Sequence, residues 1–361
     1  MPLEELDYMR RKLLRPRLNL FPLCLFAVLS ISLILKFRKH NSSLWSNLSA
    51  HPPSVQLVLA ATRGTELGWA RQLKVRNLEV IPYIADDPSA PYHPPENKGN
   101  EAMVYLTYLY AFYDKLPDIS IFAHGDDRSW HVDSALESST AYAIEHLDLN
   151  EILQRQYVNL RVSWENACPN WINTSVTGSS PQYKPHLKAE EQFMKQAFLE
   201  NFPGDPVPQI LSQPCCSQFA VTKEVIRSIP RSQFQLQINW LRAVGLGSEI
   251  SGRVWEHLWQ WMFLKKAIDC PVEYKALCRY YHICFEGEQD LGNWKEHDAS
   301  MDHLIKQKEE ILEGGNPLRN AGLKKLDQQI KEYNDHLELW KQKAIERGKS
   351  EKKRIEIAGD L

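Results

Sequence analysis

The sequence predicts an α/β domain whose mostly parallel sheet is covered by helices, as in glycosyltransferase-A-like folds, between an N-terminal transmembrane helix and a C-terminal helical tail. Three observations predict it: apolar strand-like runs alternate with helical segments, a nearly uncharged stretch precedes them, and a Lys/Glu-rich helical pattern closes the chain. The 361 residues have a formal net charge of -2 and 43% hydrophobic residues. They allow one sizeable core and give no sign of a nucleic-acid partner.

The stretch at residues 18–37 is long and apolar enough to cross a bilayer as a helix. It runs into "KFRKH" instead of a small-residue cleavage site, which favours a signal anchor over a cleaved signal peptide. Basic residues are more numerous in segment 1–17 than after the span, so that segment is expected in the cytosol. We therefore expect a single-pass type II protein of the Golgi or endoplasmic reticulum, with a stem at 38–54 and a lumenal domain at 55–290.

Two features fit a lumenal domain. Glycosylation sequons begin at Asn41, Asn47 and Asn173. Six cysteines follow the span, an even number that is compatible with three disulfides, although free buried thiols are the alternative: Cys168, Cys215, Cys216, Cys270, Cys278 and Cys284.

The first half of the domain alternates strands and helices. Apolar runs at 55–61, 78–85 and 119–124 predict buried strands. Between them, 66–75 has helical spacing, and 100–113 is apolar on every side, which predicts a central buried helix. Strands that are apolar on both faces indicate a parallel sheet, whose ligands bind beyond the carboxyl ends of its strands.

The second half continues with a predicted strand at 157–164 and a Pro/Ser/Gly-rich loop at 165–186. The "QFAVT" run is expected to be extended, and "KEVIRSI" helical. Residues 251–266 predict a core helix with Ser251 as its N-terminal cap, and Glu256 and His257 lie beside its apolar stripe.

The apolar residues of the tail at 300–355 have the spacing of a coiled-coil helix. Residues 314–317 separate this helix from a shorter one before it. Its stripe consists of Leu323, Leu326, Ile330, Tyr333, Leu337, Trp340 and Ala344. The tail either forms a homo-oligomer or lies as a helix on the domain.

Polar loops follow the predicted strands at the ligand-binding edge. Asp126 and Asp127 are candidate ligands for Mn²⁺ or Mg²⁺, because hard cations prefer carboxylate oxygens and would neutralise a diphosphate. Asp86–Asp87 is a second possible pair, and an acidic turn is the alternative for both.

Other groups supply substrate contacts. His124 and His131 could approach each other in a transition-metal or substrate site, with a structural role as the alternative, and Trp130 offers a flat face for a sugar ring or packs in the core. Candidate phosphate and substrate contacts at a helix start are Asn97, Lys98 and Glu101. The chain has no nucleophile elbow, zincin motif, zinc-spaced Cys/His set or Rossmann fingerprint.

Six ordered blocks over roughly residues 55–287 carry a resemblance: "NKGNEAMVYLTYLYAFYDKLPD", "FAHGDDRSWH", "YVNLRVSW", "CCSQFAVT", "SGRVWEHLWQWMF" and the last three cysteines. They closely resemble a mainly fungal family catalogued as a domain of unknown function. The resemblance implies a fungal source and, by analogy only, a glycosyltransferase-like domain. It supports the frame of His124, Trp130 and His131 more than the aspartate pair.

We expect a metal-assisted glycosyltransferase-like enzyme that uses a nucleotide sugar. His131 or Glu256 would act as the base, Asp126 and Asp127 would hold the metal, Asn97 and Lys98 the phosphates, and Trp130 the ring. The alternative is a membrane-anchored, non-enzymatic accessory or tailoring protein of a fungal secondary-metabolite pathway.

Overall fold

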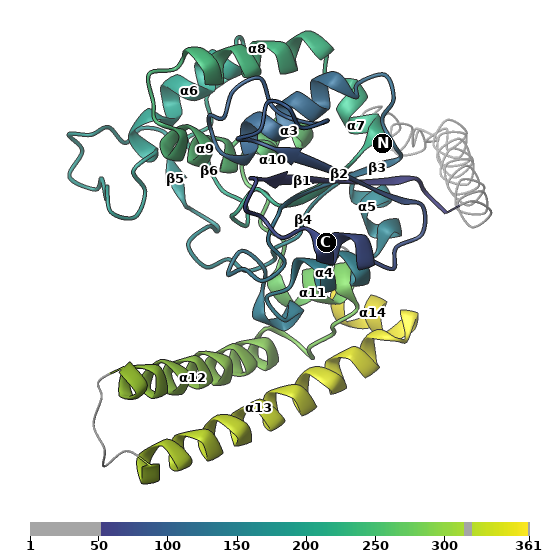
Figure 1. The fold of residues 1–361 in the computed structure, drawn as a ribbon, viewed down its shortest axis with the longest axis vertical. Helices are drawn as coiled ribbons and strands as arrows, with labels where there is room; N and C mark the ends of the chain where they lie inside the picture. Colours follow the sequence, from purple (N-terminus) through teal and green to yellow (C-terminus); the bar gives the residue numbers. More distant parts are fainter. Residues whose placement is uncertain (1–51, 314–319, 360–361) are drawn as a thin grey trace, which may run out of the picture. The chain divides into compact units, whose positions relative to one another are not determined.

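The structure is a computed structural model that describes residues 52–313 and 320–359 (Figure 1). The predicted cytosolic segment, membrane span and most of the stem fall within residues 1–51, outside the described part, as do the sequons at Asn41 and Asn47. Among the helices that the structure describes, none combines the length and the apolar character needed to cross a bilayer.

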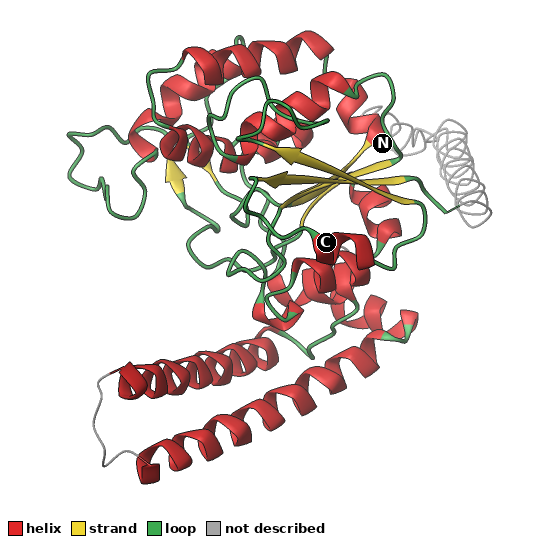
Figure 2. Cartoon of the chain, in the orientation of Figure 1, coloured by secondary structure: helices red, strands yellow, loops and turns green. Residues whose placement is uncertain are grey.

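A central sheet with the strand order β2-β1-β3-β7-β4 organises the domain (Figure 2). The strands are β1 (Val55–Ala61), β2 (Leu78–Ile84), β3 (Ile119–His124), β4 (Tyr157–Asn159) and β7 (Phe219–Thr222). β1 pairs in parallel with β2 and β3, which confirms the predicted parallel core of the sheet. β7 is extended as predicted, but it runs antiparallel to both β3 and β4.

Helices cover both faces of this sheet. One face carries α3 (Glu101–Ala111), α6 (Met194–Asn201), α7 (Lys223–Ser228), α8 (Arg231–Ala243), α9 (Ser248–Glu256) and α10 (Trp259–Leu264). The other face carries α4 (Thr140–His146), α5 (Leu149–Arg155) and α11 (Glu273–Tyr281). Alternate β1 side chains enter the two cores, Val58 on one face and Leu57 on the other, so the strand is buried on both sides. A separate small sheet pairs β5 (Ile172–Asn173) with β6 (Ile210–Leu211).

One predicted strand and one predicted helix extend beyond the observed elements. The predicted strand 157–164 ends at Asn159. Leu160 N–H still donates to the Gln218 carbonyl at 2.9 Å, but Asp133 then accepts the N–H groups of Val162 and Ser163, so they do not continue the strand pairing. The predicted helix 66–75 is only a 3-10 turn, η1 (Gly68–Gln72). Its Trp69 Nε1 donates to the Gly125 carbonyl at 2.8 Å, which fixes the short turn against the loop after β3.

The predicted helix 251–266 is two helices, α9 and α10, separated at His257 and Leu258. Ser251 is not its cap: it lies buried inside α9, and its Oγ donates to the Gly247 carbonyl at 2.9 Å. The end of α9 leaves the backbone carbonyl of Glu256 without a partner in the helix. Gln213 Nε2 donates to this carbonyl oxygen at 2.6 Å, which stabilises the break.

The tail forms α12 (Glu288–Glu313), α13 (Asn320–Gly348) and α14 (Glu351–Ala358). α12 and α13 lie side by side (Figure 1), and Trp294 Nε1 of α12 donates to the Leu337 carbonyl of α13 at 3.2 Å. Leu337 and Ala344 of the predicted stripe are buried in the core that also contains α11. The tail therefore packs within its own chain, and homo-oligomer formation stays a prediction.

We expect Trp294→Ala to lower the free energy of unfolding by about 3 kcal/mol, because it removes a large buried side chain from the base of the tail. Chemical denaturation of the full chain measures this loss. Leu339→Ala is the control, since Leu339 is 57% exposed on α13 and its truncation should change stability by less than about 0.5 kcal/mol. Equal losses for the two variants would contradict the packing described.

Candidate functional site

The candidate site lies at the sheet edge where β1, β2 and β3 end. Because β7 is antiparallel, the chain enters β7 at this same edge, through the segment Cys215–Gln218. The loop after β3 carries His124 to His131, and α3 begins nearby at Glu101. Crevices beyond the carboxyl ends of parallel strands are the usual ligand sites of such sheets.

Glu101 and Glu256 form a carboxyl pair. Both residues keep some exposure to solvent, but protein atoms surround and desolvate their carboxyl groups. Burial, followed by the charges of Glu101 and Glu190, raises the pKa of Glu256 to about 8. Burial likewise raises the pKa of Glu101. Tyr105 is fully buried nearby, and burial and the charges of both carboxyls raise its pKa, so its hydroxyl keeps its proton. The pair therefore retains a proton near neutral pH and can exchange it.

The segment Cys215–Gln218 connects this pair to the histidines. The Cys216 backbone N–H donates to Glu256, and the Ser217 side chain hydrogen-bonds to Glu101. Trp259 Nε1 donates to Ser217 Oγ at 3.1 Å, which leaves the hydroxyl proton for the carboxylate.

The next residue, Gln218, holds the loop that carries the histidines. Its Oε1 accepts the His124 backbone N–H at 3.1 Å, and its Nε2 donates to the His131 carbonyl at 3.3 Å. Acids and histidines are thus held by consecutive residues of one short segment.

His124, His131 and Ser129 form one hydrogen-bonded group. Ser129 Oγ accepts the His131 backbone N–H at 3.2 Å and lies 2.5 Å from His131 Nδ1. His124 Nδ1 lies 3.2 Å from the same His131 nitrogen, so one of the two rings supplies the proton between them. His124 Nε2 is buried and has no hydrogen-bond partner among the described residues.

Both histidines are neutral at physiological pH. Burial lowers the pKa of His124 to about 4, and burial, His124 and Arg161 lower the pKa of His131 to about 4. His131 is consequently a poor base, and neither ring adds charge to the site.

Trp130 is not packed in the core: it is 71% exposed. Its ring centroid lies 4.1 Å from that of His131, and the Arg161 guanidinium carbon lies 5.7 Å from the ring. Arg161 Nη1 also donates to the Trp130 carbonyl at 3.1 Å, which fixes the exposed ring beside the histidines. A flat ligand can stack on its free side.

The two aspartates have different surroundings. Asp127 Oδ1 accepts from Ser139 Oγ at 2.7 Å and from the Ala141 N–H at 2.9 Å, so it fixes the start of α4. Asp126 is exposed. In residues 52–313 and 320–359, no group of three or more His, Cys, Asp or Glu side chains is arranged to hold a metal ion. Asp127 Oδ1 is engaged in hydrogen bonds and Asp126 is exposed, and a metal held by both carboxylates stays a prediction.

Of the predicted contacts Asn97, Lys98 and Glu101, it is Glu101 that belongs to the carboxyl pair. Lys98 Nζ donates to the Val244 carbonyl at 2.6 Å and to the Arg242 carbonyl at 3.3 Å, at the C-terminal end of α8. Asn97 is exposed. Of the predicted sequons, Asn173 lies half-buried in β5. The roles predicted for these residues stay predictions.

Several site residues escaped the sequence reasoning: Ser129, Arg161, Ser217, Gln218 and Tyr105. The adjacent Cys215 and Cys216 were recognised as possible disulfide partners, and the structure pairs them with each other. The remaining pairs are Cys168–Cys270 and Cys278–Cys284, so the six cysteines form three disulfides.

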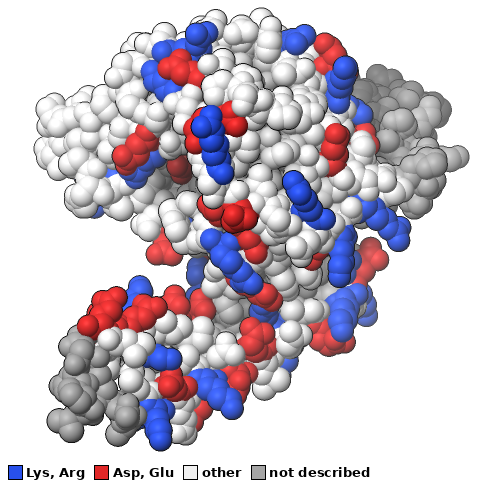
Figure 3. Space-filling model, in the orientation of Figure 1, with Lys and Arg blue, Asp and Glu red and all other residues white. Residues whose placement is uncertain are grey.

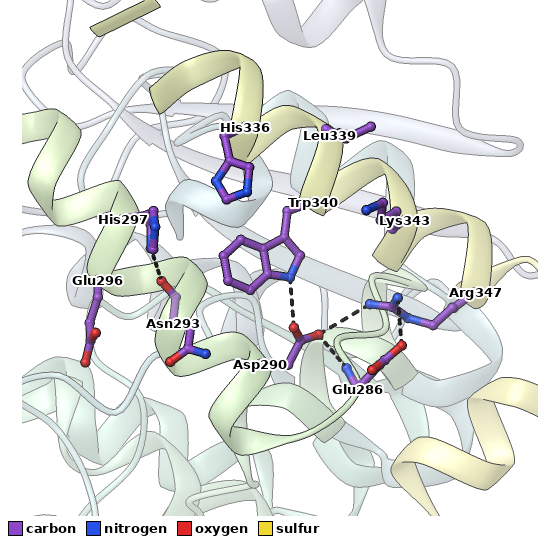
Figure 4. A pocket seen from close by; sticks show the side chains of 10 residues that line it. All are labelled: Glu286, Asp290, Asn293, Glu296, His297, His336, Leu339, Trp340, Lys343 and Arg347. Carbon is purple, nitrogen blue, oxygen red and sulfur yellow. Dashed lines mark hydrogen bonds and ion pairs between the residues drawn. The ribbon is translucent and has the colours of Figure 1, made fainter. Parts of the chain in front are cut away.

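A hollow of about 450 Å³ lies between α12 and α13 (Figure 4). Trp340 projects between the two helices, and its Nε1 donates to Asp290 at 2.8 Å. Arg347 pairs with both Glu286 and Asp290. These groups chiefly bind one another, so the contacts that line the hollow hold the helices of the tail together. On the face drawn in Figure 3, basic and acidic side chains are interspersed.

The fold and the site define a three-layer α/β/α protein with acid–base groups at the carboxyl edge of its parallel strands. The chain belongs to the family described as Protein of unknown function (DUF3431), whose sequence model matches residues 57–279. The match includes the acids, the histidines and the Cys215–Gln218 segment, and it ends within α11, before α12 and α13. No curated protein and no solved structure matches the chain.

The raised pKa of Glu256 predicts that its contribution to stability falls as pH rises from about 4.5 to about 8. In this window the folded state keeps a proton that the unfolded state, with a pKa near 4.5, has released. The loss approaches about 1.4 kcal/mol per pH unit for one such proton. Melting temperatures should fall less steeply for Glu256→Gln than for the unchanged protein.

The control for this experiment is Glu66→Gln, since Glu66 is exposed. Its pH dependence should match that of the unchanged protein. Parallel curves for Glu256→Gln and the unchanged protein would show that Glu256 has an ordinary pKa.

Proposed function

We propose that the protein is a glycosyltransferase-like enzyme that moves a sugar from a nucleotide sugar to an acceptor hydroxyl, with Glu256 as the general base. The observation that supports this most is the closely surrounded carboxyl pair of Glu101 and Glu256, held by Cys216 and Ser217 at the edge where α/β sheets bind ligands. A base with a pKa near 8 is well matched to catalysis around neutral pH.

The proposed step is a displacement at the anomeric carbon. Glu256 takes the proton of the acceptor hydroxyl while the acceptor oxygen bonds to the anomeric carbon. The bond to the diphosphate breaks, and the nucleoside diphosphate leaves with the electron pair. Burial and the negative charges of Glu101 and Glu190 raise the pKa of Glu256, so its deprotonated carboxylate is a stronger base than that of a solvated glutamate.

The histidine and tryptophan side chains would orient the substrate. The neutral His131 ring, which lies beside the exposed Trp130 ring, would hydrogen-bond to a sugar hydroxyl. Trp130 would stack on the apolar face of a ring. His131 is the weaker of the two predicted bases, because its pKa of about 4 leaves little driving force for taking a proton.

The proposal retains a lumenal, membrane-anchored location in a fungal secretory pathway. The three disulfides support an oxidising compartment. Exposed Arg63, which pairs with Asp87 at 3.3 Å beyond the ends of β1 and β2, is available for the diphosphate. Mn²⁺ or Mg²⁺ stays part of the proposal with Asp126 as its open carboxylate, and no step above depends on it.

We expect Glu256→Gln to lower the transfer rate by about 10²- to 10⁴-fold, because the amide cannot take a proton. Calorimetry should find nearly unchanged donor binding. In the unchanged enzyme the rate should rise with pH up to about 8, as Glu256 loses its proton. Glu249→Gln is the matched control on α9, with its side chain 79% exposed. Full activity of Glu256→Gln across candidate donors would end the proposal.

Variants of the two aspartates are expected to behave differently in a cation titration. Asp126→Asn should raise the Mn²⁺ concentration needed for donor binding, because it removes the open carboxylate. Asp127→Asn should instead lower the melting temperature, since it weakens the hydrogen bonds at the start of α4. Donor binding that is identical with Mn²⁺, with Mg²⁺ and with a chelator would remove the cation from the proposal.

A further inference from the structure

We propose that the Cys215–Cys216 disulfide is a modification site: a dithiol reductant opens it, and its opening releases the acid–base groups. The regulated activity rests on the proposed function, whereas the release of the groups does not depend on it. The inference comes from the contacts of these two cysteines with Arg161 and with the carboxyl pair.

Access and charge favour reduction at this position. Cys215 is half-exposed, whereas Cys216 is 3% exposed. Arg161 Nη1 lies 3.3 Å from Cys215 Sγ and 3.5 Å from Cys216 Sγ. A cation beside a sulfur stabilises its thiolate, and a thiolate with a lowered pKa is the better leaving group.

The other disulfides lack this combination. Cys278 and Cys284 are fully buried. Cys168 and Cys270 are half-exposed like Cys215, but within the described residues no Arg or Lys hydrogen-bonds to their sulfurs. Cys168–Cys270 is therefore a matched internal control for access.

The exchange proceeds in two displacements. The reductant thiolate attacks the accessible Cys215 Sγ, the bond between the two cysteines breaks, and Cys216 leaves as a thiolate beside Arg161. The second thiol of the reductant then displaces Cys215 and closes the reductant's own disulfide. The protein gains two electrons and two protons, and the dithiol loses them.

The backbone shows what this disulfide restrains. Cys216 has φ of 88° and Ser217 has φ of 49°. These values lie in the left-handed region, which residues other than glycine rarely adopt. Once the covalent link is gone, these residues can return to negative φ. The Cys216 N–H would then leave Glu256, and the Ser217 hydroxyl would leave Glu101.

The effect should extend to the histidines. Gln218 follows directly and holds the backbone of His124 and His131 through its side-chain amide. A change of φ at Ser217 redirects Gln218, so the loop after β3 loses its attachment. Reduction would therefore separate the carboxyl pair from the two histidines without unfolding the sheet.

The test titrates the full chain with dithiothreitol and follows alkylated cysteines by mass spectrometry. Cys215 and Cys216 should be labelled at lower dithiothreitol concentrations than Cys168 and Cys270. Arg161→Met should raise the concentration needed for Cys215 and Cys216 alone. Earlier labelling of Cys168 and Cys270 would overturn the inference.

A second readout detects release of the site. Amide hydrogen exchange in peptides spanning 122–131 should accelerate about tenfold on reduction and recover on reoxidation. Cys215→Ser with Cys216→Ser should show the fast exchange permanently, and Cys168→Ser with Cys270→Ser should not. Unchanged exchange after complete reduction of Cys215–Cys216 would refute the switch.

These readouts need no substrate, so they test the switch even where the proposed transfer activity fails. Where transfer is detected, reduction of Cys215–Cys216 should lower it and reoxidation should restore it. Activity that persists at full reduction would reject the switch and leave the proposed function standing.

Discussion

The candidate site depends on the contacts of one four-residue segment, Cys215–Gln218. It lies where the antiparallel β7 enters the edge at which the parallel strands end. Its backbone and side chains contact Glu256, Glu101 and the loop that carries His124 and His131. Those groups come from three separate elements, α3, α9 and the loop after β3, and this segment contacts all three.

Desolvation acts in opposite directions on the two kinds of titratable group in this site. It raises the pKa of Glu256 and lowers the pKa of His131, so both groups favour their neutral forms. A site with few fixed charges can accept an anionic donor while retaining proton donors and acceptors. The flat, exposed ring of Trp130 adds contact area without adding charge.

Sequence patterns predicted the parts of the fold that depend on local periodicity. The strands β1, β2 and β3 and the buried helix α3 follow from runs of apolar residues. The direction of β7 and the end of β4 could not be predicted, because they depend on pairing and on Asp133, which lies far from β4 in sequence. The break at His257 depends likewise on Gln213.

The site was predicted in its residue types more than in its connections. The motif at 122–131 contains His124, Trp130 and His131, which the structure brings together. Nothing local indicates that Asp127 fixes α4 or that Lys98 caps α8, since both contacts join distant segments. The carboxyl pair has the same origin: Glu101 and Glu256 interact only after α3 and α9 pack together.

Infrared titration of the carboxyl groups tests the central claim most directly. The difference spectrum between the unchanged protein and Glu256→Gln isolates the carbonyl band of the protonated Glu256 carboxyl. This band should persist at neutral pH and disappear around pH 8. A band that disappears near pH 4.5, the ordinary value for glutamate, would contradict a desolvated carboxyl pair at the sheet edge.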